Sequence, residues 1–256
     1  METKEESNRK ADRAEIRTEH LTFSYDGGKA VLSDLSFSVF RGESVGLIGE
    51  NGAGKSTLLK ILVGLLPGYR GKAEVGGLQV EKKYLRQIRT KAGYVFQDSE
   101  SQLFLSTVYE DVAFGPRNYG LDEAEVDRRV MEALEQVHME ALKDRQIYRM
   151  SGGQKKLAAI ATVLSMRPET ILLDEPSGAL DPRNRRNLIR VIRTLQGTKI
   201  VASHDLDLIL DTCERTLLLG EGRLIKDGPT EAILTDESLL AAHGLELPLS
   251  LMRRSR

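Results

Sequence analysis

One glycine-rich segment of the sequence has a spacing that suits the binding of phosphate groups. Residues 49–56 are GENGAGKS and match the pattern G-x-x-x-x-G-K-[ST]. Glycines allow a tight turn whose backbone N–H groups point at an anion, and a following helix adds its positive N-terminal end. In this pattern the Lys55 ammonium reaches the β- and γ-phosphates of a nucleotide, and the Ser56 hydroxyl ligates Mg²⁺. We predict that the residues contacting the phosphates are Gly49, Asn51, Gly52, Gly54, Lys55, Ser56 and Thr57.

The segments on either side of this loop support the prediction. Ser44–Ile48 is a short apolar run that suits a buried central strand, and Thr57–Leu65 is apolar enough for a buried helix. The alternative is an ordinary glycine-rich turn, which would not need an apolar strand before it and an apolar helix after it. A strand, this loop and a helix in that order predict a nucleoside triphosphatase, a class that includes kinases, GTPases, helicases and transporter subunits.

Two adjacent acids follow a second apolar run. Thr170–Leu173 is expected to be a buried strand, and Asp174 and Glu175 come directly after it. Asp174 is suited to holding Mg²⁺ through water, which leaves Glu175 to orient or deprotonate an attacking water. Adjacent strand residues point to opposite faces, so a turn at Glu175-Pro176 must re-aim the second acid. A solvated turn with two surface acids is the alternative.

A second glycine segment, Ser151-Gly152-Gly153-Gln154, precedes an alanine- and leucine-rich helix expected at Lys155–Ser165. The exposed N–H groups at a helix start form an anion site. Because one ATP needs only one phosphate loop, a second anion site in the same chain requires an explanation. The alternative is a glycine helix cap with no role in binding.

Composition and patterning set the broad class. Of the 256 residues 40% are hydrophobic, which is enough for a buried core. The net charge of −1 gives no general attraction to nucleic acid. The single cysteine, Cys213, excludes an internal disulfide and fits a reducing compartment. No apolar run approaches the roughly 20 residues that span a bilayer, and the charged N-terminus is not a signal peptide. We therefore expect a soluble, cytoplasmic chain.

The remaining pattern favours an α/β fold with a parallel sheet, because buried strands alternate with helices. Residues 85–165 are expected to be mainly helical. Other expected elements are strands at Ile16–Tyr25, Leu35–Phe40 and Lys199–Ala202, helices at Ala124–His138 and Pro182–Leu195, and a hairpin over 215–226.

The order of the motifs resembles the nucleotide-binding subunit of ATP-binding cassette (ABC) proteins over about residues 16–240. Along the chain come the phosphate loop, Gln97, the Ser151–Gln154 segment, Asp174-Glu175, Ala179-Leu180-Asp181 and His204. The resemblance implies a P-loop core with a parallel sheet, an antiparallel β-subdomain and a helical subdomain at about residues 85–165. Together these form an ATPase domain of residues 15–240, with a flexible extension at 1–14 and a tail at 241–256.

The same resemblance implies roles for individual residues. Tyr25 corresponds to an aromatic residue that stacks on adenine, and Gln97 to a glutamine that senses Mg²⁺ and the membrane partner. His204 corresponds to a histidine that contacts the γ-phosphate. The implied cofactors are ATP and Mg²⁺. The implied catalytic residues are Glu175, His204 and Gln97, and the implied metal-binding residues are Ser56, Gln97 and Asp174.

The resemblance also implies that the site is shared between two subunits. Ser151, Gly152, Gly153 and Gln154 correspond to a signature that contacts ATP bound to the opposite subunit. Asp181 corresponds to an acid that links the two sites. The partner is then a second copy of the chain or a paralogue, and no nucleic acid is involved.

Gln102–Pro116 resembles the ATPases of energy-coupling-factor (ECF) importers of vitamins and metals, whose pattern is Q-L-F…T-V…E-D-V-A-F-G-P. Leu239–Pro248 is similar to the cobalt and nickel branch. This implies a peripheral protein on the cytoplasmic face of the membrane, bound to a transmembrane scaffold subunit and a substrate-binding membrane subunit. Leu103, Phe104, Leu105 and Val108 are expected to line the groove for the scaffold or to lie in the core.

Three other classes are weighed against this one. A non-transport ABC ATPase usually carries a coiled-coil insertion, a tandem cassette or basic patches, none of which is evident. An ABC exporter or another class of ABC importer remains an alternative. A P-loop GTPase or kinase is disfavoured because the sequence has no Asn-Lys-x-Asp guanine motif and because the Ser151–Gln154 segment would be unexplained.

Overall fold

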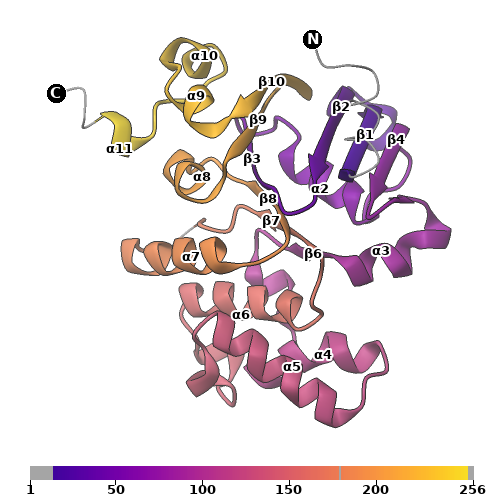
Figure 1. The fold of residues 1–256 in the computed structure, drawn as a ribbon, viewed down its shortest axis with the longest axis vertical. Coiled ribbons are helices and arrows are strands. Elements are labelled where there is room, and N and C mark those ends of the chain that lie inside the picture. Colours follow the sequence, from indigo (N-terminus) through magenta and orange to yellow (C-terminus); the bar gives the residue numbers. More distant parts are fainter. Residues whose placement is uncertain (1–13, 179, 253–256) are drawn as a thin grey trace.

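The computed structural model of the chain describes residues 14–178 and 180–252. In Figure 1 a four-stranded sheet lies at upper right, a six-stranded sheet runs through the middle, and the helices α4, α5 and α6 lie below. The expected α/β class is confirmed. The expected extension at 1–14 lies outside the described residues except for Ala14, which begins β1.

The six-stranded sheet has the order β10-β9-β3-β8-β7-β6. Its five strands from β9 to β6 are parallel to their neighbours, and β10 pairs antiparallel with β9. The strands are β3 (Ser44–Ile48), β6 (Ala92–Val95), β7 (Thr170–Asp174), β8 (Thr198–Ala202), β9 (Arg215–Gly220) and β10 (Arg223–Pro229). Every residue of β3, β7 and β8 is buried, as expected for parallel strands covered on both faces.

The smaller sheet is antiparallel and has the order β2-β1-β4-β5. Its strands are β1 (Ala14–Phe23), β2 (Leu32–Phe40), β4 (Arg70–Val75) and β5 (Leu78–Gln79). Strand β2 alternates buried and more exposed residues, which is the pattern expected of a sheet with one face in the core.

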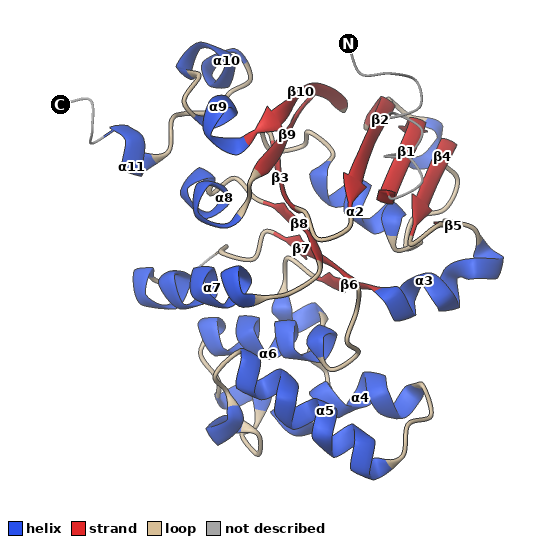
Figure 2. Cartoon of the chain, viewed as in Figure 1, coloured by secondary structure: helices blue, strands red, loops and turns tan. Residues whose placement is uncertain are grey.

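Helices surround the larger sheet and form the lower lobe (Figure 2). They are α2 (Lys55–Leu62), α3 (Leu85–Lys91), α4 (Val108–Asn118), α5 (Glu123–Gln136), α6 (Gly152–Leu164), α7 (Pro182–Thr194), α8 (Leu206–Thr212), α9 (Thr230–Leu234), α10 (Glu237–Ala242) and α11 (Leu249–Met252). Several begin at a side chain that accepts a hydrogen bond from a backbone N–H of the first turn, as Thr107 does for α4 and Asp122 for α5.

The six-stranded sheet separates two hydrophobic cores. Side chains alternate along each strand, so Leu47 of β3 belongs to the core shared with the antiparallel sheet and α2, whereas Ile48 belongs to the core shared with α4–α6. Leu172 and Leu173 of β7 are divided in the same way. The carboxyl ends of β3 and β7 are therefore held between two packed layers.

The structure adds two strands that the sequence pattern did not predict, and it decides between two positions expected for one side chain. Ala92–Val95 is the edge strand β6, although it falls in the stretch expected to be mainly helical. Strand β4 was not expected, because Arg70–Val75 contains two basic residues and a glutamate. Val108 is fully buried in the core, which is one of the two positions expected for it. The other expected strands and helices are present, with ends that differ by a few residues.

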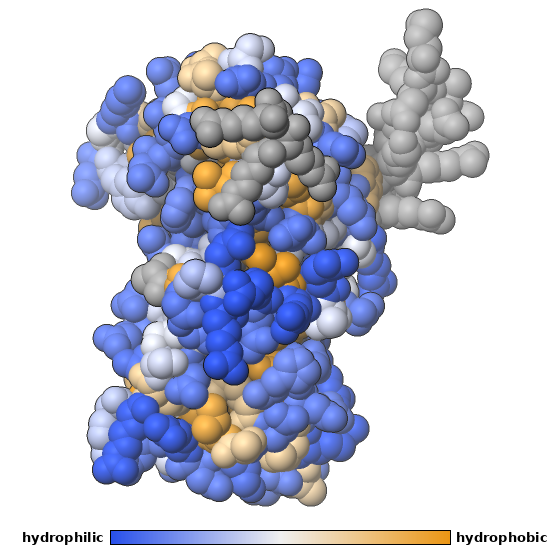
Figure 3. Space-filling model, turned by 90° about the vertical axis from the view of Figure 1, so that its left-hand side faces the viewer, coloured by the Kyte–Doolittle hydropathy of each residue, from blue (hydrophilic) through white to orange (hydrophobic). Residues whose placement is uncertain are grey.

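No helix among residues 14–178 and 180–252 is long and apolar enough to cross a bilayer. The face shown in Figure 3 is largely hydrophilic, with smaller apolar patches between the charged side chains.

Candidate nucleotide-binding site

The phosphate loop connects the end of β3 to the start of α2. Gly49 has φ 150°, and a Cβ there would lie 2.3 Å from the carbonyl oxygen of Leu219, so the neighbouring strand leaves no room for a side chain. Gly54 precedes α2 with φ 98°, in the left-handed region that favours glycine. The loop therefore curls at the carboxyl edge of the sheet, and the N-terminus of α2 faces the turn.

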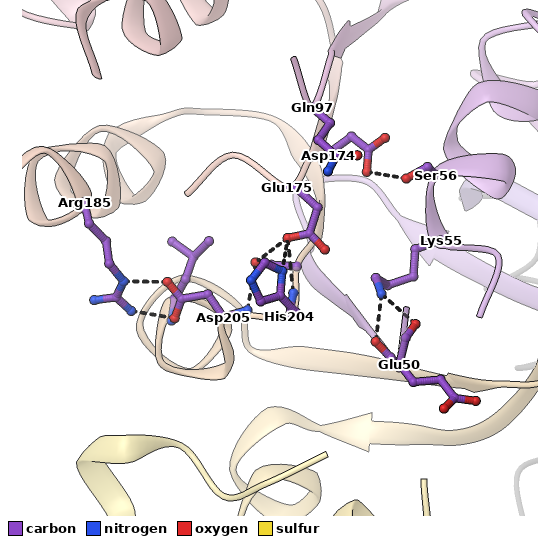
Figure 4. Close-up of polar contacts among 12 residues, drawn as sticks. Glu50, Lys55, Ser56, Gln97, Asp174, Glu175, Arg185, His204 and Asp205 are labelled. Atoms are coloured by element: carbon purple, nitrogen blue, oxygen red, sulfur yellow. Dashed lines mark hydrogen bonds and ion pairs between the residues drawn. The ribbon is translucent and has the colours of Figure 1, made fainter. Parts of the chain in front are cut away.

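Lys55 lies inside the curl of this loop (Figure 4). Its ammonium donates to the carbonyl oxygens of Gly49 at 2.7 Å and Glu50 at 3.1 Å. Burial lowers the pKa of Lys55, while the carboxylates of Glu175 and Asp174 oppose this shift. Because the ammonium lies among carbonyls on the inner side of the loop, it is placed to meet a phosphate that enters there.

Ser56 and Asp174 bring two oxygen ligands together from elements that are far apart in the sequence. The Ser56 hydroxyl donates to Asp174 Oδ1 at 2.8 Å, and Asp174 is only 1% exposed. A hydroxyl and a carboxylate are the hard oxygen donors that Mg²⁺ prefers. The pair therefore fits a magnesium ion, which would neutralise charge on the bound phosphates.

Glu175 points away from Asp174, although the two are adjacent. Its φ of 44° is in the left-handed region, which supplies the turn expected at this position. Its Oε2 atom lies 2.7 Å from His204 Nδ1 and accepts longer hydrogen bonds of 3.3 Å from the Ser203 hydroxyl and the His204 backbone N–H. The histidine side chain is 62% exposed and that of Glu175 9%, so the pair runs from the interior to the surface.

All the predicted loop residues except Gly49 line one pocket of about 570 Å³, together with Tyr25, Gln97, Glu175 and His204. Asp174 does not line this pocket but a second hollow that Gln97 also borders. Tyr25 stands at the rim of the first pocket, 47% exposed, with its hydroxyl 3.2 Å from Thr57 Oγ1. An exposed aromatic ring beside a phosphate loop is available for stacking on a base. The first pocket is lined by Tyr25, Val31, Asn51, Gly52, Ala53, Gly54, Lys55, Ser56, Thr57, Gln97, Glu175 and His204.

The second glycine segment does not line this pocket. Ser151 caps α6 in a reciprocal arrangement: its hydroxyl accepts from the Gln154 N–H, and the Gln154 side chain accepts from the Ser151 N–H. Ser151 and Gly152 are exposed. Gly153 is buried against α7, where a Cβ would lie 2.5 Å from Asn184.

Asp181 is also outside the pocket. Its carboxylate caps α7 by accepting from the N–H groups of Arg183 and Asn184, at 2.9 and 3.0 Å. Hydrogen bonds from Asn184 lower the pKa of Asp181. Asp181, Ser151 and Gly152 thus lie on the surface at the starts of two neighbouring helices. Ala179 of the same motif lies outside the described residues.

Three contacts at the site involve residues that the motifs did not single out. The Tyr94 hydroxyl donates to Asp174 Oδ2 at 2.7 Å, and Lys156 of α6 donates to the carbonyl oxygen of Gln97 at 2.6 Å. Ser203 donates to Glu175. Each of these residues is next to, or a few residues from, a recognised motif, but no spacing rule indicates which way its side chain points.

The arrangement can bind a nucleoside triphosphate and activate water beside it. Lys55 and the loop N–H groups can hold the phosphates, and Glu175 can accept a proton from the attacking water. His204 lies against Glu175 and reaches the surface, so it can contact the terminal phosphate from the open side of the pocket. The pocket is open to the surface and is not enclosed by the described residues that line it.

The sequence has clear relatives among known proteins. Residues 32–178 match the family described as ABC transporter. An ABC transporter ATP-binding protein of Geobacter sulfurreducens is 48% identical over 92% of this chain and 95% of its own. The energy-coupling factor transporter ATP-binding protein EcfA of Carboxydothermus hydrogenoformans is 43% identical over 91% of this chain and 87% of its own. The cobalt import ATP-binding protein CbiO of Rhodobacter capsulatus is 42% identical, with shares of 91% and 85%.

The fold also has solved relatives. The structure of cbiO1 from Clostridium perfringens, described as part of the ABC transporter complex cbiONQ, superposes with a TM-score of 0.81. The two chains are 33% identical, and the match covers 95% of this chain and all of the other. A bacterial Atm1-family ABC exporter also superposes, with a TM-score of 0.77 and 26% identity over 94% of this chain and 42% of its own, so sequence and structure agree on the ABC transporter ATPases as a whole.

Proposed function

The chain belongs to the ABC transporter ATP-binding family, whose members bind ATP and hydrolyse it to drive transport, and from this premise we propose that it powers an energy-coupling-factor importer of a transition-metal ion, cobalt or nickel, or of a vitamin. The observation that carries the proposal is the identity of 42–43% with relatives named EcfA and CbiO over 91% of this chain. The Gln102–Pro116 segment supports the same group.

A groove of about 540 Å³ beside this segment supports a membrane partner. It is lined by Leu103, Phe104 and Leu105 on one side and by Ile147 and Tyr148 on the other. Phe104 and Tyr148 are 63% and 70% exposed, which is unusual for large side chains. Phe104 is held edge-to-face against Phe114 with ring centroids 5.0 Å apart. A fixed, exposed aromatic pair beside a groove suits an apolar helix of a scaffold subunit.

The groove also carries a polar pair at its edge. Lys155 of α6 forms an ion pair with Glu100, so the groove is apolar in its middle and charged at one side. This is the common composition of a docking surface. In the proposed complex the chain is peripheral, on the cytoplasmic face of the membrane, and a separate membrane subunit binds the transported substrate.

We assign the site as follows. Tyr25 stacks on adenine, and the loop from Gly49 to Thr57 binds the phosphates. The residues that bind Mg²⁺ are Ser56, Asp174 and Gln97. Glu175 activates water with His204 beside it. The open side of the pocket is closed by Ser151–Gln154 and Asp181 of a second ATPase subunit, either a second copy or a paralogue.

The test is co-expression with the candidate scaffold and substrate-binding subunits, followed by purification and reconstitution in vesicles. We expect the vesicles to accumulate cobalt, nickel or a vitamin only when ATP is supplied on the side of the membrane that carries the ATPase. Phe104→Ser should reduce the amount of co-purified scaffold about fivefold or more, because it removes an aromatic side chain that the scaffold would bury in the complex. Leu249→Ser, which alters a side chain 68% exposed on α11, is the matched control and should leave the complex intact.

Two results would contradict the proposal. One is the absence of any complex with the membrane subunits. The other is a complex that forms and hydrolyses ATP but accumulates none of these substrates, which would favour another class of ABC transporter.

A further inference from the structure

Tyr94 makes a contact with Asp174 for which the motifs provide no reason. The residue lies on the edge strand β6, which pairs in parallel with β7, and its Cα is in register with that of Leu172. Because Asp174 is two residues further along β7, on the same face of the sheet as Leu172, the Tyr94 ring extends along the sheet toward it. The hydroxyl then reaches Asp174 Oδ2 at 2.7 Å.

The two oxygens of Asp174 therefore accept from two different hydroxyls. Ser56 donates to Oδ1 at 2.8 Å, and Tyr94 donates to Oδ2. Asp174 is 1% exposed, so water does not replace either donor readily. A carboxylate held at both oxygens has one orientation, whereas one held only at Oδ1 can turn about its terminal torsion.

The tyrosine is itself held in place. Its ring is 8% exposed and packs edge-to-face against Phe96, with ring centroids 4.7 Å apart and planes at 67°. Its backbone is fixed by the β6–β7 ladder. The hydroxyl thus approaches Asp174 from a rigid support on β6, the edge strand beside β7.

We propose that Tyr94 is a positioning residue for the magnesium site: by holding Oδ2, it directs Oδ1 of Asp174 toward Ser56 and the phosphate loop. The inference rests on the proposed role of Asp174 in binding Mg²⁺, and it is independent of what the transporter carries. Removal of the hydroxyl leaves Asp174 Oδ2 buried without a hydrogen-bond donor. The carboxylate can then turn, and its orientation must be fixed when the ion binds. Outer residues that orient metal ligands typically account for a 10- to 100-fold effect on metal affinity or activity.

Tyr94→Phe tests this, because it removes one oxygen and keeps the ring. The measurement is binding of a fluorescent ATP analogue to the purified chain, in EDTA and across a titration of free Mg²⁺. We expect the Mg²⁺ concentration that half-saturates the tightening of the analogue to rise about tenfold, with affinity in EDTA unchanged. Tyr94→Leu, which also lacks a donor, carries the same expectation if the phenylalanine variant does not fold.

Tyr69→Phe is the matched control. The Tyr69 hydroxyl also makes a 2.7 Å hydrogen bond, to the carbonyl oxygen of Val80, but it lies away from the site. The two variants should lose similar thermal stability, and only the Tyr94 variant should change the Mg²⁺ titration.

Asp174→Ala distinguishes failure of this inference from failure of the site assignment. If Asp174→Ala removes the effect of Mg²⁺ and Tyr94→Phe leaves the titration unchanged, the positioning role is overturned and the site stands. If Asp174→Ala also leaves the titration unchanged, the magnesium role of Asp174 is wrong, and the inference about Tyr94 falls with it.

Discussion

The phosphate loop at Gly49–Thr57 and the glycine segment at Ser151–Gly153 are similar in composition but lie in different surroundings. Both have glycines at the start of a helix. The loop at Gly49–Thr57 curls around Lys55 and meets Glu175 and His204 in one pocket. In the Ser151–Gly153 segment Ser151 caps α6, and the segment does not line that pocket.

The difference indicates that a glycine-rich helix start can either form a site or complete one elsewhere. The loop lies at the carboxyl edge of a buried sheet, where other strands bring acids to it. Helices α6 and α7 instead begin at the surface, and Ser151, Gly152 and Asp181 are exposed there. Among the described residues this segment does not line the pocket of its own chain, and an anion-binding role for the Ser151–Gly153 segment would be explained if it meets the ATP of another subunit. The predictions below test this division, beginning with the largest expected effect.

Glu175→Gln should slow ATP hydrolysis by about 10²–10⁴-fold, the usual contribution of a general base. The amide keeps the size of the side chain but accepts no proton, so ATP binding should persist and a closed dimer should accumulate. The measurements are phosphate release and the size of the particle with ATP. Near-normal turnover would exclude Glu175 as the base, and Glu231→Gln on α9 is the control.

Gly152→Asp should reduce hydrolysis by about 10²-fold or more, as removal of one donor to a developing anion does. A Cβ at Gly152 meets nothing within 4 Å, so the chain should fold and bind ATP normally. The new carboxylate would repel the phosphates of the partner's nucleotide. Gly152→Ala is the control, because it adds the Cβ without the charge and should have little effect.

Mixing the two inactive variants sharpens this prediction. In a dimer of one Glu175→Gln and one Gly152→Asp subunit, one site has both changes and the other has neither. Random pairing of equal amounts should therefore restore about a quarter of the active sites. If activity does not return on mixing, a site shared between two copies of this chain is contradicted.

Lys55→Ala should weaken ATP binding by about 10-fold or more, the range for loss of a hydrogen bond to a charged group. This effect should be visible in the monomer, because Lys55 acts on its own chain's nucleotide. Titration with a fluorescent ATP analogue measures it. Lys60→Ala, on the same helix but outside the loop, provides the comparison, and equal losses in the two variants would argue against a specific role for Lys55.

Ser203→Ala should have the smallest effect, a two- to tenfold loss of turnover, since it removes one long hydrogen bond to Glu175 and one that the hydroxyl accepts from the Asp205 N–H. The contact between Glu175 and His204 Nδ1 remains in this variant. Steady-state ATP hydrolysis measures the loss. A decrease as large as that of Glu175→Gln would mean that Ser203, and not the histidine, sets the position of the base.

Much of the fold was predictable where a single stretch of sequence shows both the hydrophobic pattern of a strand or helix and the residues that end that element. Ser44–Ile48 is apolar after its first residue and is followed by the loop glycines, and the structure has a strand at those residues. Strand β6 could not be recognised in this way, because four residues next to a helix carry little pattern of their own. It is a strand because β7, 78 residues further along, pairs with it.

The sequence by itself determined the chemistry of this protein: a phosphate loop, a pair of acids, a histidine and a second glycine segment in an order that indicates an ABC ATPase. These follow from residue types at short spacings along the chain, which local geometry already constrains. Only the tertiary structure decided which of them share a pocket, that Tyr94 and Ser56 hold opposite oxygens of Asp174, and that Val108 is core while Phe104 is exposed. The reason is that these contacts depend on the register of strands and the packing of layers, which join residues distant in sequence.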